Sequence, residues 1–198
     1  MAALWTTIAG CLAAVTLTAS ADGGERRLWF SGAYSFSDEL GGFLIRGVSG
    51  IGTKANPIVI EQEMLSASPV TLVIRVASKI RTDGPVGTFA TGMVHLRIRS
   101  LNNSGVAWTE YEFELQEQLG IPSVHGDGLS FDQRRVNPEN RSSDSFRIHD
   151  TDFEPNDRLV FSEGYVDPLE TADFKFFITD FTPKLEFYIR QDPRIPLS

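Results

Sequence analysis

The residues from His149 to Gly164 carry five carboxylates in sixteen positions. Asp150, Asp152 and Glu154 alternate with other residues, so an extended backbone directs their side chains to one side. Together with Asn156 and Asp157 they offer the hard oxygen ligands that calcium prefers. The spacing is not that of an EF-hand loop. We therefore interpret this stretch as a solvated polar rim, with a structural calcium site at Asp150, Asp152, Glu154 and Asp157 as the alternative.

Three more carboxylates alternate along one predicted strand, at Glu110, Glu112 and Glu114. They resemble the acidic strand of jelly-roll glycoside hydrolases of the laminarinase type. Such enzymes need two carboxyl groups about 5 Å apart, one of them an acid of raised pKa. This strand departs from that pattern, because a Glu replaces the central Asp and the last spacing is one residue shorter. A solvated face neutralised by Arg97 and His95 is our first interpretation, and a hydrolase-like enzyme is the alternative.

Other catalytic motifs are incomplete. The segment from Gly47 to Ile51 lacks the last Gly that a nucleophile elbow needs. The three histidines, His95, His125 and His149, lack the spacing of zinc ligands. We therefore predict a protein that is not an enzyme and has no certain cofactor.

Aromatic side chains are the candidates for ligand binding. We name Trp108, Trp29 and Tyr165 as residues that could stack on a glycan, although aromatic side chains in a β-sandwich more often pack in the core. The binding hypothesis predicts an exposed row of aromatics on one face of the fold, with Trp108 its best member.

The first residues, Met1 to Ala21, read as a cleaved secretory signal peptide. They carry no charged side chain and end in Ala19-Ser20-Ala21, the small-x-small pattern of signal peptidase sites. An uncleaved anchor and a lipobox ending at Cys11 are the alternatives. We expect export to the periplasm or the cell exterior, a single domain over residues 22–198, and no membrane span after cleavage.

The charge and cysteine content exclude several classes. The net charge is −8, and the stretch from Asp144 to Asp180 holds ten acidic against three basic side chains. Nucleic acid is therefore not expected as a partner, since phosphate binding needs clustered Lys and Arg. The single cysteine lies in the predicted signal, which excludes a disulfide scaffold or a thiol nucleophile in the mature domain.

The elements that carry these residues read as strands. Residues 94–101 and 109–116 alternate apolar and polar side chains, which predicts one buried and one exposed face for each. Turn residues separate about ten such segments: 28–36, 43–48, 57–64, 70–76, 94–101, 109–116, 145–149, 158–161, 174–178 and 185–190. This pattern predicts an all-β fold, an antiparallel β-sandwich, for which a jelly roll is one arrangement.

The turn at 102–105 predicts a hairpin between the segments that flank it. In that register Leu96 faces Tyr111, and Arg97 faces Glu110. The run from Asn102 to Tyr111 also resembles the N-x-[ST]-G-x-x-W-x-x-[FY] hairpin of various exported, mostly uncharacterised bacterial β-sandwich proteins. The resemblance covers about ten residues and implies export and a sandwich, without an activity.

These observations favour an exported, non-catalytic binding or cell-envelope module whose partner is a glycan or an envelope protein. A hydrolase-like enzyme built on the Glu110 strand and a structural or adhesin subunit are the alternatives. The last of these predicts an unpaired sheet edge and oligomers in solution.

Overall fold

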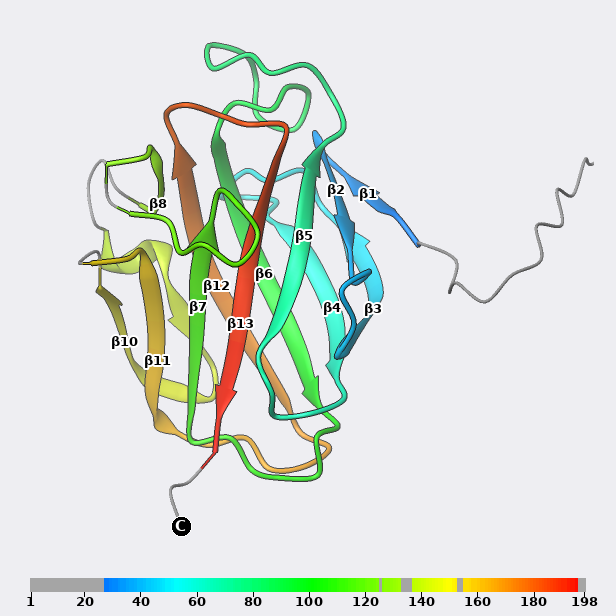
Figure 1. Ribbon diagram of the computed structural model, residues 1–198, viewed down its shortest axis with the longest axis vertical. Coiled ribbons are helices and arrows are strands. Elements are labelled where there is room, and N and C mark those ends of the chain that lie inside the picture. Colours follow the sequence, from blue (N-terminus) through cyan, green and yellow to red (C-terminus); the bar gives the residue numbers. More distant parts are fainter. Residues whose placement is uncertain (1–26, 125, 133–136, 153–154, 196–198) are drawn as a thin grey trace, which may run out of the picture.

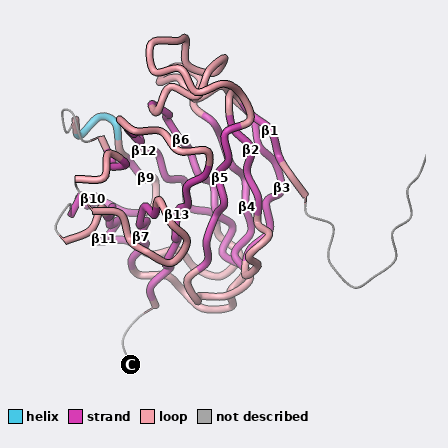
Figure 2. Tube along the Cα trace, turned by 45° about the horizontal axis from the view of Figure 1, so that its top comes forward, coloured by secondary structure: helices cyan, strands magenta, loops and turns pink. Residues whose placement is uncertain are grey.

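The computed structural model describes residues 27–124, 126–132, 137–152 and 155–195 of the chain. The predicted signal peptide and Glu154 lie outside these residues, and Asp152 is described by its backbone alone. The described chain is almost entirely strand and loop, with a single 3-10 turn, η1, at Pro138–Asn140 (Figure 2).

Two sheets lie face to face, with β5, β7 and β13 in front of β4, β6 and β12 in Figure 1. The seven-stranded sheet has, in spatial order, β1 (Trp29–Ser31), β2 (Tyr34–Ser37), β5 (Val70–Val76), β13 (Glu186–Arg194), β7 (Glu110–Gln116), β11 (Arg158–Gly164) and β10 (Phe146–Asp152). The six-stranded sheet has β3 (Phe43–Ser49), β4 (Ile58–Met64), β6 (Met93–Asn102), β12 (Thr171–Asp180) and β8 (Leu129–Phe131), and β9 (Ser142–Ser143) pairs with β12. The prediction of an all-β sandwich is confirmed; the jelly roll stays a prediction.

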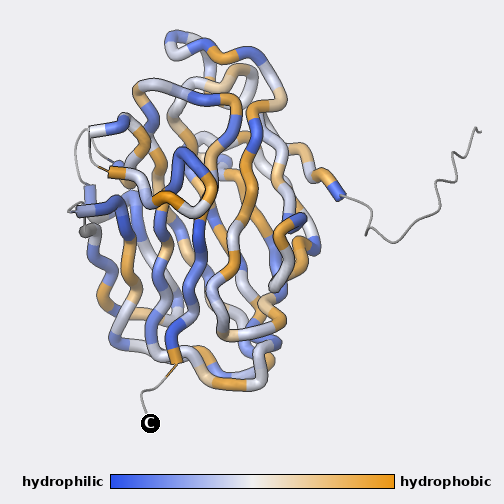
Figure 3. The backbone as a smooth tube through the Cα atoms, viewed as in Figure 1, coloured by the Kyte–Doolittle hydropathy of each residue, from blue (hydrophilic) through white to orange (hydrophobic). Residues whose placement is uncertain are grey.

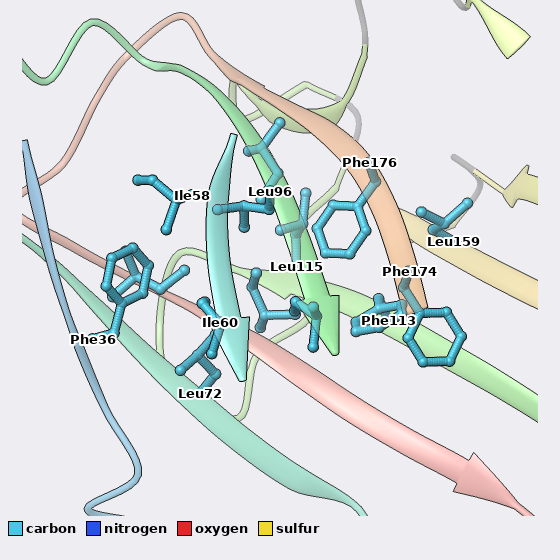
Figure 4. Close-up of a cluster of buried hydrophobic side chains, with 14 of the residues drawn as sticks. Phe36, Ile58, Ile60, Leu72, Leu96, Phe113, Leu115, Leu159, Phe174 and Phe176 are labelled. Carbon is cyan, nitrogen blue, oxygen red and sulfur yellow. The ribbon is translucent and has the colours of Figure 1, made fainter. Parts of the chain in front are cut away.

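The core forms because both sheets turn their apolar residues inward. Apolar and polar residues alternate along the strands (Figure 3), and the inward set packs between the sheets (Figure 4). At its centre Phe113 of β7 lies against Phe174 and Phe176 of β12, with ring centroids 5.2 and 4.8 Å apart. Burying one such side chain stabilises the fold by about 1.5–3 kcal/mol, so these contacts across the layers hold the two sheets together.

The predicted hairpin between 94–101 and 109–116 is wrong. Strand β6 pairs with β12 and, in parallel, with β4, whereas β7 lies in the other sheet between β11 and β13. The alternation did identify the buried faces, since Leu96 and Tyr111 are both buried. It could not identify the neighbours, because a buried face is equally satisfied by either layer.

The turn at 102–105, which carries the Asn, Ser and Gly of the N-x-[ST]-G-x-x-W-x-x-[FY] motif, leads from β6 in one sheet to β7 in the other. Asn102 is fully buried, and its amide donates 2.9 Å hydrogen bonds to the carbonyl oxygens of Val106 and Val166. The Trp108 indole donates to Ser104 Oγ at 3.1 Å. Asn, Ser and Trp in this motif thus fix the crossing, which is a structural role.

A buried polar bridge joins the sheets. The Gln62 amide of β4 donates to Gln191 Oε1 of β13 at 2.7 Å and to Ser100 Oγ of β6 at 2.8 Å. Gln191 returns a 3.1 Å bond to Gln62 Oε1, and the Tyr111 hydroxyl of β7 donates to Gln191 Oε1 at 3.2 Å. Because an unpaired amide in this core would be costly, the bridge fixes how the layers align.

Candidate functional site

The three glutamates of β7 lie in a network of charges on the outer face of the seven-stranded sheet. Strands β11 and β13 flank β7, so arginines from both reach these carboxylates. We call this set the charge array, and it consists of Glu110, Glu112, Glu114, Arg158, Arg190, Asp192 and Arg194.

Glu112 lies at the centre of the charge array. Its side chain contacts Arg194, and its Oε1 lies 3.9 Å from both Arg158 Nε and Arg190 Nη1. The residue is only 3% exposed. Burial raises the pKa of the Glu112 carboxyl, and the charges of Arg194 and Arg158 offset only part of that increase.

Glu114 is buried as well and is held by two neighbours. Gln116 Nε2 donates to its Oε1 at 2.9 Å, and Arg158 Nε lies 3.6 Å from its Oε2. Glu110 is less buried and pairs with Arg194 Nη1 at 3.1 Å. The solvated face predicted for this strand is therefore correct only at the Glu110 end, and the neutralising cations come from β11 and β13 instead of Arg97 and His95.

A shallow hollow of about 600 Å³ opens at the Glu110 end of the charge array. Its polar groups come from Thr109, Glu110, Asp192 and Arg194. Its apolar wall consists of Ala67, Pro193 and Ile195. Hydroxyl, carboxylate and guanidinium groups beside an apolar surface can hold a polyhydroxylated ligand, because they both donate and accept hydrogen bonds.

The geometry of the charge array bears on the hydrolase alternative. A raised pKa at Glu112, with carboxylates at Glu110 and Asp192 nearby, agrees with part of what that alternative requires. However, Glu112 is covered and its oxygens face guanidinium groups, whereas a general acid must reach a glycosidic oxygen within hydrogen-bond distance. Of the carboxylates in the charge array, only those of Glu110 and Asp192 line the hollow.

The predicted aromatic row does not form around Trp108. Trp108 is fully buried against Tyr111, with ring centroids 5.4 Å apart, so the prediction that it lies on an exposed face is wrong. Trp29 is in β1 at one edge of the seven-stranded sheet, where Arg27 lies 4.1 Å above its ring. Tyr165 is 65% exposed, but it follows β11 near the opposite edge of that sheet. The three candidates are therefore not brought together.

The candidate calcium ligands are only partly described. Asp150 is exposed on β10 and accepts a hydrogen bond from the Thr151 amide at 2.9 Å. Asp157 is fully buried and accepts a 3.0 Å bond from Ser130 Oγ of β8, so its carboxylate lies inside the fold. Within the described part of the chain, no three acidic, His or Cys side chains lie close enough together to hold a metal ion.

The arginines of the charge array are the site residues that sequence reasoning missed. Arg158, Arg190 and Arg194 come from segments far from β7 in sequence, and only the strand order brings them to it. The available signal was their spacing, since Arg190, Asp192 and Arg194 alternate and must share one face of a strand.

Comparisons with known proteins do not place the chain in a family. No family model, curated protein or solved structure matches it. Among the residues that the structure describes, none belongs to a helix that is long and apolar enough to cross a membrane.

Proposed function

We propose that this protein is an exported, non-catalytic binding module that holds a polar glycan in the hollow at the end of the charge array. The observation that carries the proposal is the lining of that hollow by Thr109, Glu110, Asp192 and Arg194 next to an apolar wall. Sugars present hydroxyl groups at their edges and C–H groups on their faces, so both surfaces of the hollow find a match.

The ion pairs of the charge array support binding over catalysis. Arg194 contacts both Glu110 and Glu112, which holds its guanidinium in place before any ligand arrives. Preorganised donors lose little conformational entropy on binding, so they favour a specific ligand. The same contacts occupy Glu112, the carboxyl group whose raised pKa would otherwise suit an acid catalyst.

The test is titration of the protein with neutral oligosaccharides and solubilised envelope polysaccharides, followed by NMR or calorimetry. Glu110→Gln removes one charged acceptor from the hollow. Its matched control is Glu61→Gln on the other sheet, because Glu61 also pairs with an arginine, Arg99, at 3.2 Å. Losing a charge-assisted hydrogen bond of about 1.5–3 kcal/mol should weaken binding roughly tenfold or more in Glu110→Gln.

The control variant should bind as the wild type does. The proposal is wrong if no glycan shifts the signals of Thr109 and Arg194, or if both variants weaken binding equally. Binding of an envelope protein at the same residues, without glycan binding, would replace the glycan by a protein partner.

A hydrolase-like enzyme is the second candidate, because Glu112 has a raised carboxyl pKa beside Glu110. The glycans that bind should be incubated with wild-type protein and with Glu112→Gln, and new reducing ends should be measured. Release by the wild type that disappears in Glu112→Gln would establish the enzyme and exclude a purely binding role.

A further inference from the structure

A second hollow lies on the outer face of the six-stranded sheet, on the opposite side of the molecule from the charge array. It has a volume of about 130 Å³. Its polar lining comes from Lys54, His95, Glu139, Asn140 and Lys175. His95 and Lys175 lie on the neighbouring strands β6 and β12, whose intervening residues Leu96 and Phe176 turn into the core.

The ring of His95 lines this hollow, and Phe177 packs against one face of that ring. His95 and Phe177 are directly opposite in the β6–β12 ladder, and their ring centroids are 4.2 Å apart at an interplanar angle of 20°. Both side chains are partly exposed. Burial and the charge of Lys54 lower the pKa of His95, so its imidazole is neutral at neutral pH and can donate one hydrogen bond.

Among the described residues around the hollow, Lys175 is a cation without a counterion. Lys54 Nζ lies 3.7 Å from Glu139 Oε2, and Arg97 is paired with Asp173. Among the described residues, Lys175 has no carboxylate within ion-pair distance, although it is exposed beside the hollow. A single uncompensated ammonium group matches one negative charge and would leave a doubly charged phosphate poorly neutralised.

Other charged and polar groups face the same region. Asp132 acts on His95 from the chain after β8 and tends to raise its pKa. Asn140 of η1 donates its amide to Asp132 Oδ2 at 2.9 Å, which restrains both side chains. Among the described residues, the hollow therefore combines an exposed cation that has no ion pair with the flat ring of a neutral imidazole.

We propose that this hollow binds the carboxylate of a uronic acid residue, with Lys175 as its charge partner and the His95 ring, backed by Phe177, as a platform for the sugar ring. Sugar rings stack on flat side chains, and the ammonium group supplies the charge-assisted hydrogen bond. The site is independent of the hollow at the charge array, because it lies on the other sheet.

The test uses methyl β-D-glucuronide, with methyl β-D-glucoside as the uncharged match, in NMR titrations that follow the His95 ring and the Lys175 amide. The glucuronide should shift both signals and raise the pKa of His95, because a bound anion favours the charged imidazolium. The glucoside should not. Lys175→Met keeps the apolar stem and should weaken glucuronide binding about fivefold, the most that one exposed ion pair contributes.

The controls separate this site from unspecific charge effects and from the proposed function. Lys79→Met removes an exposed lysine from the loop after β5 and should bind the glucuronide as the wild type does. Glu110→Gln should also leave these shifts unchanged. Equal shifts with glucuronide and glucoside, or no shift at His95, would overturn the proposal. Equal affinity for N-acetyl-aspartate amide would also overturn it, in favour of a peptide carboxylate.

Discussion

The polar bridge between the two sheets gives the sharpest prediction about stability. Gln191→Met keeps the length and shape of the side chain but removes both hydrogen-bonding groups. Gln62 Oε1 then loses the 3.1 Å bond from Gln191, and the Tyr111 hydroxyl loses its 3.2 Å bond. Both positions are buried, so water cannot easily replace the lost partners.

The expected cost follows from the groups left unpaired. A buried polar group without its partner costs about 1–3 kcal/mol, and Gln62 keeps its bond to Ser100. We therefore expect Gln191→Met to lower the free energy of unfolding by about 2–3 kcal/mol. Gln62→Met should cost a similar amount. The double variant should cost clearly less than the sum, because the two amides are then absent together.

Urea unfolding of the four proteins, followed by tryptophan fluorescence, measures these differences. The slope of the transition should stay constant, so that the midpoints report stability alone. Single variants that unfold with the wild type would refute the reasoning, because the bridge would then contribute nothing. A double variant whose cost equals the sum would show that the two amides do not depend on each other.

Four further predictions concern single positions. Burial raises the pKa of the Asp180 carboxyl, so its stabilising contribution is present below the unfolded pKa of about 4 and is lost as pH rises through the folded pKa. Asp180→Asn should therefore be more stable than the wild type at pH 7 but not at pH 4. Thermal melts at both pH values test this. Gly50→Ala should destabilise the protein far more than Gly105→Ala in the same melts. Both glycines have a positive φ, 92° and 80°. A Cβ at position 50 would collide with the Pro57 carbonyl, whereas a Cβ at position 105 would meet nothing within 4 Å. Asn102→Ala should cost about 1–3 kcal/mol in urea unfolding, because the Val106 and Val166 carbonyl oxygens each lose one donor and Ser104 loses its acceptor. An effect as small as that of an exposed substitution would contradict the structural role of Asn102 at the crossing. Melts in calcium and in EDTA should be identical for the wild type and for Asp150→Ala, because Asp157 is bonded to Ser130 in the interior. A melting temperature that calcium raises in the wild type but not in Asp150→Ala would instead establish the metal site.

The sequence predicted which residues face the core better than it predicted which strands are neighbours. Alternation at period two is local, so it identified the buried sides of 94–101 and 109–116. Strand pairing depends on segments that are distant in sequence, and β6 pairs with β4 and β12 instead of β7. The segment 28–36 was predicted as one strand but is two, because Gly32 adopts a φ of 56° and turns the chain between β1 and β2.

The candidate site was predictable only at its carboxylates. Glu110, Glu112 and Glu114 do share one face, as their spacing requires. Their burial could not be read from the sequence, since it depends on arginines brought in by β11 and β13. Trp108 was misplaced for a related reason: a large aromatic beside a turn suits a binding surface and a core equally well, and here the crossing between sheets buries it.

The strand order also has a consequence for how the molecule is made. Strand β13, the last of the described strands, lies between β5 and β7, so the larger sheet cannot be continuous until residues 186–194 have emerged from the ribosome. Strand β4 likewise cannot pair with β6 until the chain has formed β5 in the other sheet and returned. Such non-local pairing slows folding. Until residues 186–194 have emerged, β5 and β7 each lack the partner that joins them, and the two parts of the larger sheet on either side of β13 stay separate.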